Sequence, residues 1–175
     1  MGLFGHLGFA LAVKRFTPQI PLWVLLFCSM LIDIPAMIFW TLPLWITHGL
    51  IMAIIWSLIS MFISIIIFLY LNIKTQKIKN KKSINMIIFL SLVIGIVVFS
   101  HWVIDLIGWS MTGNGIPLLF DDSQLLMLNI QIDIIIGLLI MEIGPFIIGL
   151  IMYIQYFKKV RKEKENIIVS PTTSP

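Results

Sequence analysis

Four long apolar segments constrain this chain to a membrane fold. They cover about residues 21–40, 48–71, 84–109 and 127–157, and Leu, Ile, Val, Phe and Met dominate each of them. One helical crossing of a bilayer needs ~20 predominantly apolar residues. None of the segments shows the strict two-residue alternation of a barrel strand, so each is predicted to be a helix. The sequence therefore predicts an all-α membrane protein built as a four-transmembrane-helix bundle.

The rest of the chain leaves little room for anything else. Of the 175 residues, 59% are hydrophobic and only 11% are charged, which is too little charge to cover the surface of a soluble domain. Residues 1–162 are predicted to form a single transmembrane domain. Residues 2–13 are apolar but too short to span, and their charges follow the apolar run, so we expect a half-inserted or interfacial helix rather than a signal peptide. Residues 163–175 are polar, and we expect a disordered cytoplasmic tail.

The positions of the basic residues orient the predicted helices. All twelve fall into three groups, and residues 41–47 and 110–126 contain none. With four crossings every basic residue lies on one side, whereas three or five crossings would split the groups. The positive-inside rule then places both termini in the cytoplasm, and membrane lipid rather than nucleic acid is the expected partner of these charges. The groups are Lys14 and Arg15; Lys74, Lys77, Lys79, Lys81 and Lys82; and Lys158, Lys159, Arg161, Lys162 and Lys164.

Seven ionisable residues interrupt the apolar segments. Burying such a group inside a bilayer is energetically costly, so each of these residues is treated as a candidate functional residue. From a helical rise of ~1.5 Å per residue, Asp33 lies ~18 Å above the cytoplasmic end of its segment, and His101 lies ~25 Å above the end of its own. Five of the seven converge on one layer in the outer half of the membrane, while Asp133 is expected at the outer interface and His6 joins only if the N-terminal helix inserts. The five are Asp33, His48, His101, Asp105 and Glu142.

Backbone features accompany this polar layer. Pro35 and Pro145 each lack an N–H group and are expected to disrupt the preceding helical turn, which is tolerated in a membrane where the turn lines a polar cavity. Gly137 and Gly144 are seven residues apart and would permit close approach of another helix. Together these features favour a packed polar site over isolated substitutions.

Three interpretations of the layer remain open from the residues alone. Imidazole nitrogens with carboxylate oxygens suit a divalent metal, first Zn²⁺ and alternatively Mn²⁺ or Fe²⁺. His101 and Asp105 are four residues apart and share a helix face, which also fits a hydrogen-bonded pair that ties helices together. The third interpretation is a transport route or proton path.

The same residues give the sequence a resemblance to a known group. The order and spacing of five fragments resemble small bacterial inner-membrane proteins described as membrane-bound metal-dependent hydrolases. The resemblance implies a metal site formed by His6, Asp33, His48, His101 and Asp105. Members of the group often carry a further His-x-Pro-Asp after the third helix, where this chain has Trp109-Ser110-Met111-Thr112. The fragments are Gly5-His6-Leu7-Gly8 with Lys14-Arg15 and Pro18; Asp33; Thr47-His48-Gly49-Leu50; Ser100 to Asp105; and Glu142.

The leading hypothesis is therefore a metal-dependent hydrolase of the bacterial inner membrane. Its catalytic residues would be Asp105 and Glu142, which would orient a water or act as base. The depth of the site suggests a lipid or lipid-linked substrate. The alternatives are a small transporter or proton-coupled membrane component, and a non-catalytic subunit of a membrane complex.

Overall fold

The computed structural model describes residues 3–39, 42–74, 81–111, 113, 115–119, 125–128 and 133–169. Nearly all of its regular structure is helical, with one two-residue antiparallel ladder that pairs Ile116 with Leu126. The elements are α1 (Leu3–Lys14), α2 (Leu22–Ser29), α3 (Asp33–Ile38), α4 (Leu44–His48), α5 (Leu50–Lys74), α6 (Lys81–Met111), β1 (Ile116–Pro117), β2 (Leu125–Leu126), α7 (Ile134–Leu138), the π-helical turn η1 (Leu139–Ile143) and α8 (Gly144–Val169).

Three stretches of helix in the described part of the chain are long and apolar enough to cross a membrane. They are Leu50–Asn72 in α5, Ser83–Met111 in α6, and Ile135–Asn166, which runs through α7, η1 and α8. Large apolar side chains are exposed along all three, among them Phe62, Ile96 and Ile148. A helix surface of this kind is compatible with lipid rather than water. The prediction of an all-α membrane protein is confirmed at this level.

The segment predicted as the first crossing, residues 21–40, is two short helices, α2 and α3, in its described part. The backbone tightens between them, because the N–H of Asp33 donates to the carbonyl of Met30 at 3.1 Å rather than to the carbonyl four residues back. Pro35 has no N–H to offer and is accommodated in the first turn of α3, where none is needed. The break is thus a consequence of the sequence at this point, and the helix pair falls short of a spanning helix.

Two other predicted boundaries also differ. His48 ends the short helix α4, and α5 begins only at Leu50, because Gly49 adopts an extended conformation between them. The last long helix starts at Ile134 rather than near Met127, and Asp133 caps it by accepting hydrogen bonds from the N–H groups of Ile135 and Ile136. The same helix continues to Val169, so residues 163–169, expected to belong to a disordered tail, are helical; residues 170–175 lie outside the described part.

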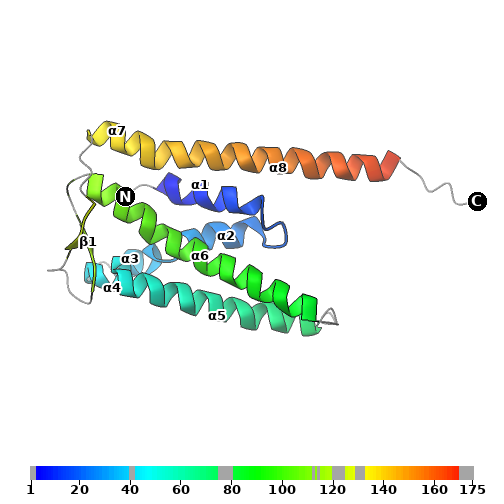
Figure 1. Ribbon diagram of the computed structural model, residues 1–175, viewed down its shortest axis with the longest axis horizontal. Coiled ribbons are helices and arrows are strands. Elements are labelled where there is room, and N and C mark those ends of the chain that lie inside the picture. Colours follow the sequence, from blue (N-terminus) through cyan, green and yellow to red (C-terminus); the bar gives the residue numbers. More distant parts are fainter. Residues whose placement is uncertain are drawn as a thin grey trace, which may run out of the picture.

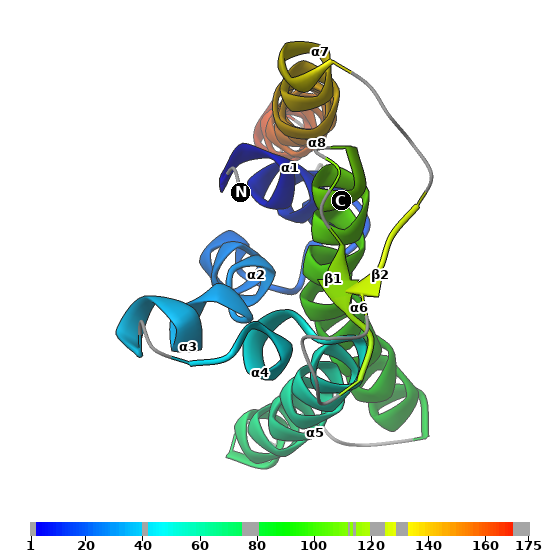
Figure 2. The same ribbon diagram turned by 90° about the vertical axis from the view of Figure 1, so that its left-hand side faces the viewer.

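The helices lie side by side with α1 at the centre of the packing. Figure 1 shows α5 and α6 as an antiparallel pair on one side and α8 on the other, with α1 and α2 between them. Viewed along the helices, α1 lies between α8 and the pair formed by α2 and α6 (Figure 2). The N-terminal helix is therefore inserted among the others: Ala10 is fully buried, and His6 is only 2% exposed.

Glycines allow α1 and α8 to approach closely. A Cβ atom at Gly8 would collide with the backbone of Pro145, and one at Gly149 would collide with the backbone of Gly8. On the α8 side, Pro145 cannot donate to the carbonyl of Met141, and the chain widens into the π-helical turn η1 immediately before α8. The freed carbonyl faces α1, because a Cβ atom at Gly5 would collide with the Met141 oxygen.

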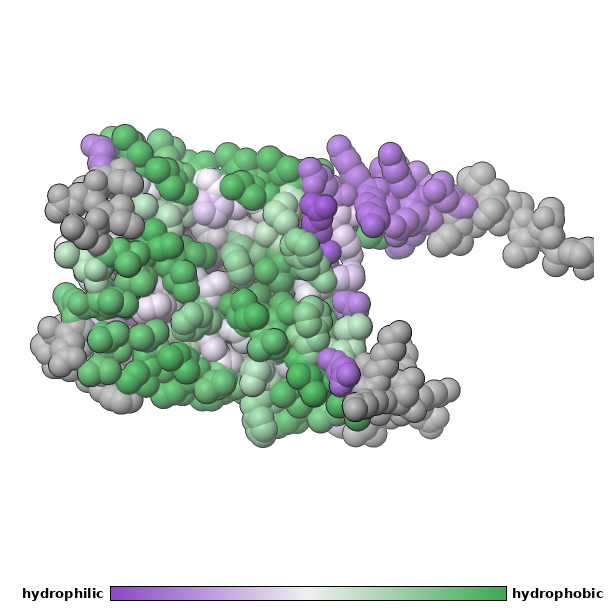
Figure 3. All heavy atoms as spheres, in the orientation of Figure 1, coloured by the Kyte–Doolittle hydropathy of each residue, from purple (hydrophilic) through white to green (hydrophobic). Residues whose placement is uncertain are grey.

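The surface separates into apolar and polar regions along the helix axes. Hydrophobic residues cover most of the face in Figure 3, and hydrophilic residues gather mainly at the end where the last turns of α8 emerge. Lys158, Lys159 and Arg161 of α8 lie at this end, and Lys14 and Arg15 at the end of α1 lie beside them. The basic residues at the end of α1 and those in the last turns of α8 therefore lie close together.

Candidate metal centre

Four of the predicted site residues converge on one point near the α3 and α4 end of the bundle. Asp33 is the first residue of α3, His48 is the last residue of α4, and His101 and Asp105 lie one turn apart on α6. One nitrogen or oxygen atom from each lies within 4.8 Å of all the others. His48, His101 and Asp105 are buried, whereas the side chain of Asp33 is 28% exposed. Asp33 is therefore the one member of the group with an appreciably exposed side chain.

The ring nitrogens and carboxylate oxygens alternate at short range. His48 Nε2 lies 3.1 Å from Asp33 Oδ1 and 3.2 Å from Asp105 Oδ2. His101 Nε2 lies 3.3 Å and 3.2 Å from the same two oxygens. Donor atoms bonded at ~2.0–2.1 Å to one tetrahedral ion lie ~3.3 Å apart, because the edge of a tetrahedron is ~1.6 times its centre-to-corner distance. The four separations therefore suit ligands that share one ion.

A main-chain carbonyl fixes the orientation of His101. Its Nδ1 lies 2.7 Å from the oxygen of Ser29, the last residue of α2. Because a carbonyl oxygen only accepts, Nδ1 carries the hydrogen, and in a neutral ring Nε2 then presents a lone pair to the carboxylates. The Ser29 carbonyl is available because the N–H of Asp33, its ordinary helical partner, donates to Met30 instead. The helix break thus supplies the group that orients the histidine.

A hydroxyl performs the same role for His48. Thr47 Oγ1 lies 3.2 Å from the carbonyl of Leu44, to which it donates, and 2.7 Å from His48 Nδ1. In the tautomer with the hydrogen on Nδ1, the Nε2 atom of His48 presents a lone pair; in the other tautomer it donates to Asp33 Oδ1 at 3.1 Å. Two lone pairs facing two carboxylates repel one another unless protons or a cation lie between them. A histidine whose second nitrogen donates to a carbonyl or hydroxyl is the usual arrangement of a metal ligand.

The hydrogen-bond inventory supports the same interpretation. His101 Nε2 and Asp105 Oδ1 are buried and have no hydrogen-bond partner among the described residues, although each lies 3.2 Å from an ionisable side chain. Buried polar atoms are normally satisfied, and an exception calls for an explanation. An ion placed between the donor atoms would satisfy His101 Nε2 without a hydrogen bond.

His6 lies beside the four-residue group rather than within it. Its Nε2 is 3.2 Å from Asp105 Oδ1, the oxygen that faces away from the shared point. Its ring stacks on the ring of His101, with centroids 3.8 Å apart and planes inclined by 8°. Asp105 therefore contacts all three histidines. On the other side of the group, Trp109 stacks on His48 with centroids 6.1 Å apart, at the position where the resembling proteins often carry a histidine.

Glu142, predicted to act as a base or to orient a water, is not part of the four-residue group. Its Oε2 accepts a hydrogen bond from the N–H of Gly5 at 3.1 Å. That N–H is one of the free donors in the first turn of α1, where a carboxylate is favoured by the helix dipole. Glu142 therefore holds the start of α1 against η1, one residue before His6.

No protein-family model, no curated protein and no solved structure matches this chain. The resemblance to membrane-bound metal-dependent hydrolases therefore stays a prediction based on the sequence fragments.

Two groups around the site were not predicted from the sequence. The carbonyl of Ser29 carries no side-chain signal, and its role depends on a break in the helix whose position only the structure gives. Thr47 was noticed only as part of the fragment around His48. Thr47 directly precedes His48, the histidine that ends a short helix, and this position is the local signal that could have indicated its role as a hydrogen-bond partner of the His48 ring.

Proposed function

We propose that this protein holds a divalent metal ion between His48, His101, Asp33 and Asp105. The observation that carries the proposal is the pair of Nε2 atoms that face two carboxylate oxygens at 3.1–3.3 Å. Two imidazoles and two carboxylates suit Zn²⁺ first, and Mn²⁺ or Fe²⁺ as alternatives. His6 and the second oxygen of Asp105 would support the ligands from behind.

We further propose that the centre promotes hydrolysis. A divalent ion bound by the four residues would supply Lewis acidity and, with a water molecule as a fifth ligand, would lower the pKa of that water. Asp33 is the better placed of the two carboxylates to accept a proton from that water, because its side chain is 28% exposed while that of Asp105 is 1% exposed. Asp105 would remain a ligand whose second oxygen is held by His6, and Glu142 would position α1.

A lipid or lipid-linked molecule is the proposed substrate class. An apolar groove of about 430 Å³ lies between α2 and α5, within the ~300–1,000 Å³ range of small-molecule sites. Its lining includes Phe27 and Cys28 of α2, Ile63 and Ile67 of α5, and Leu31, which is two residues before Asp33. An acyl chain in this groove would bring the polar end of a lipid to the exposed side of the centre.

The proposed setting is a bacterial inner membrane crossed four times. The broken pair α2 and α3 would provide the first crossing, and α5, α6 and the run from α7 to α8 the other three. Support comes from the basic residues of α1 and α8, which gather at one end of the bundle while the candidate metal centre lies toward the other (Figures 1 and 3). Under the positive-inside rule that end faces the cytoplasm.

Metal analysis of purified protein tests the central proposal. The wild-type protein is expected to retain about one equivalent of Zn, Mn or Fe, and His101→Ala and Asp105→Asn to lose it, since each removes a ligand. Asp133→Asn is the matched control, because Asp133 is a carboxylate whose hydrogen bonds to the described residues cap α7. Wild-type protein without stoichiometric metal after reconstitution with each of the three ions would refute the metal centre.

Hydrolysis is tested separately on the metal-loaded protein. Release of product from a panel of phospholipid esters and lipid-linked phosphates is expected for the wild type. Asp33→Asn, compared with the wild type at equal metal content because Asp33 is also a ligand, should lower the rate by a factor of about 10²–10⁴, the usual contribution of a positioned general base. Stoichiometric metal without turnover of any member of the panel, for wild type and variant alike, would instead support a structural or transport centre.

A further inference from the structure

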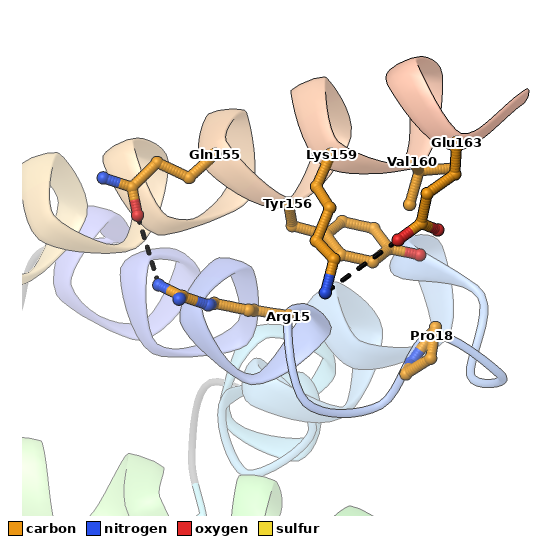
Figure 4. Close-up of a pocket in the computed structure, with 7 residues that line it drawn as sticks. All are labelled: Arg15, Pro18, Gln155, Tyr156, Lys159, Val160 and Glu163. Carbon is orange, nitrogen blue, oxygen red and sulfur yellow. Dashed lines mark hydrogen bonds and ion pairs between the residues drawn. The ribbon is translucent and has the colours of Figure 1, made fainter. Parts of the chain in front are cut away.

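A second polar site lies at the opposite end of the bundle, where α1 ends beside α8. It is a cavity of about 340 Å³ that involves Arg15, Pro18, Gln155, Tyr156 and Lys159. Figure 4 shows the side chains of Arg15, from the turn after α1, and of Lys159, from α8, in the space between the two helices. The cavity is therefore built by two segments that are far apart in the sequence.

The cations in this cavity are only weakly engaged. Arg15 Nη1 donates to Gln155 Oε1 at 3.2 Å, which orients the guanidinium group but adds no counter-charge. Lys159 Nζ lies 3.9 Å from Glu163 Oε1, and the two side chains are 77% and 62% exposed. An exposed pair at this distance contributes little to stability, so Glu163 can turn away at small cost. The site thus has two cations and one loosely held acid.

The surroundings place the cavity at the level of lipid headgroups. Lys14 Nζ donates to the carbonyls of Pro18 and Ile20 at 2.9 Å and 2.6 Å, and it lies 5.9 Å from the centre of the Tyr156 ring. Lysine and tyrosine side chains of this kind gather where a membrane surface meets water. The change from hydrophobic to hydrophilic surface along α8 occurs in this region (Figure 3).

We infer that this cavity binds the phosphate group of an anionic phospholipid in the cytoplasmic leaflet. A guanidinium group matches phosphate oxygens in a bidentate manner, and an ammonium group adds a point charge. Arg15 and Lys159 supply one of each, while Lys14 is occupied by the loop carbonyls. The acyl chains of the lipid would lie along the apolar part of α8 below the cavity.

The bound lipid would fasten the end of α1 to α8. The start of the same helix is held by Glu142, its middle by the close contact at Gly8, and it carries His6 to the side of Asp105. A phosphate that bridges Arg15 and Lys159 completes the attachment at the remaining end. The inference does not depend on any metal chemistry at the other end of the bundle.

Native mass spectrometry of the protein released from nanodiscs tests the inference, with phosphatidylglycerol and phosphatidylcholine as the lipid probes. The wild type is expected to retain one phosphatidylglycerol molecule in preference to phosphatidylcholine. Arg15→Gln with Lys159→Gln should weaken that preference by about tenfold more than the control pair Arg161→Gln with Lys162→Gln. Both pairs remove two positive charges, so non-specific attraction falls equally, and equal losses in the two variants would overturn the site.

Two further measurements keep the result decisive. Glu163→Gln removes the competing acid and should raise retention of phosphatidylglycerol, an effect that misfolding of a variant cannot produce. Excess inorganic phosphate should fail to displace the lipid, because the acyl chains contribute to its binding. Displacement by inorganic phosphate would assign the cavity to free phosphate and contradict the lipid assignment, and a Glu163→Gln protein with unchanged retention would contradict the placement of the phosphate.

Discussion

At the scale of single residues, the candidate centre depends as much on groups that orient the histidines as on the histidines themselves. His101 is oriented by the carbonyl of Ser29 and His48 by the hydroxyl of Thr47. The Ser29 carbonyl makes His101 Nδ1 a donor and leaves Nε2 for the shared point, and metal binding requires the same tautomer of His48, in which Thr47 accepts from Nδ1. A change of either partner is therefore expected to lower the metal affinity.

Thr47→Val tests this dependence with little change in shape. The variant removes the acceptor of the His48 Nδ1–H group and leaves that group without its partner in the described site. Metal affinity is expected to fall by about 10–100-fold, the usual effect of losing a group that supports a ligand. Competition with a chelator of known affinity measures the change.

Thr17→Val is the matched control for that experiment. Thr17 is also buried, and its hydroxyl also bonds a backbone carbonyl, that of Val13, but it lies at the other end of α1 from the centre. Its replacement is expected to leave metal affinity unchanged. If both valine variants weaken the metal equally, the hydroxyl of Thr47 has no specific role.

The residues of the candidate centre could be predicted from the sequence, because a charged group inside a membrane is energetically costly and therefore rare. Asp33, His48, His101 and Asp105 stood out against apolar segments, and helical rise placed them at one depth. Their partners could not be found in the same way. A backbone carbonyl is present at every residue, and whether it is free depends on hydrogen bonds made elsewhere, here by the N–H of Asp33. Glu142 satisfied the same depth criterion yet serves the start of α1.

At the scale of helices, the packing of α1 on α8 is the contact that sequence patterns described least well. Gly137 and Gly144 were expected to allow a close helix approach. A Cβ atom at either would meet only ordinary contacts at 3.7 Å, whereas Gly8 and Gly149 meet backbone directly. The hydrophobic pattern of a membrane helix does not predict which helix packs against it, because lipid and neighbouring helices are equally apolar.

Gly149→Ala and Gly144→Ala form a matched pair on α8. Alanine favours helix by about 1 kcal/mol over glycine at both positions. At Gly149 the added methyl group would collide with the Gly8 backbone and separate α1 from α8, so a net destabilisation of about 1–3 kcal/mol is expected. At Gly144 the methyl group fits, and stability should stay equal or rise.

Thermal unfolding in detergent, with metal content measured alongside, distinguishes the two glycine variants. Gly149→Ala should unfold at a lower temperature than the wild type, and Gly144→Ala should not. Because α1 carries His6 to Asp105, Gly149→Ala is also expected to bind metal more weakly. Equal unfolding temperatures for the two variants would mean that the α1 and α8 backbones are not in close contact.

At the scale of the whole molecule, one axis organises the protein. Long apolar helices run along it, with the basic residues of α1 and α8 toward one end and the His and Asp group toward the other (Figure 1). Hydrophobicity and the distribution of charge predicted the apolar helices because these two properties decide what a bilayer accepts. The same properties do not predict whether a helix runs unbroken through an apolar segment, and the first predicted crossing is broken at residues 30–32. The number of crossings is therefore the global property that most needs a direct measurement.

Accessibility of single cysteines to a membrane-impermeant maleimide measures it. Cys28 is the only cysteine, so Cys28→Ser provides a blank background. With four crossings, Lys162→Cys in α8 should be labelled only after the cells are opened, and Met127→Cys, which is 53% exposed before α7, should be labelled on intact cells. A third position, Arg15→Cys, reports on α2 and α3: it lies on the same side as Lys162 only if the broken pair crosses the membrane. If Arg15→Cys were instead labelled on intact cells, α5, α6 and α8 would be the whole set of crossings, the positive charges would be divided between the two faces, and the lipid site at Arg15 and Lys159 would have to be abandoned.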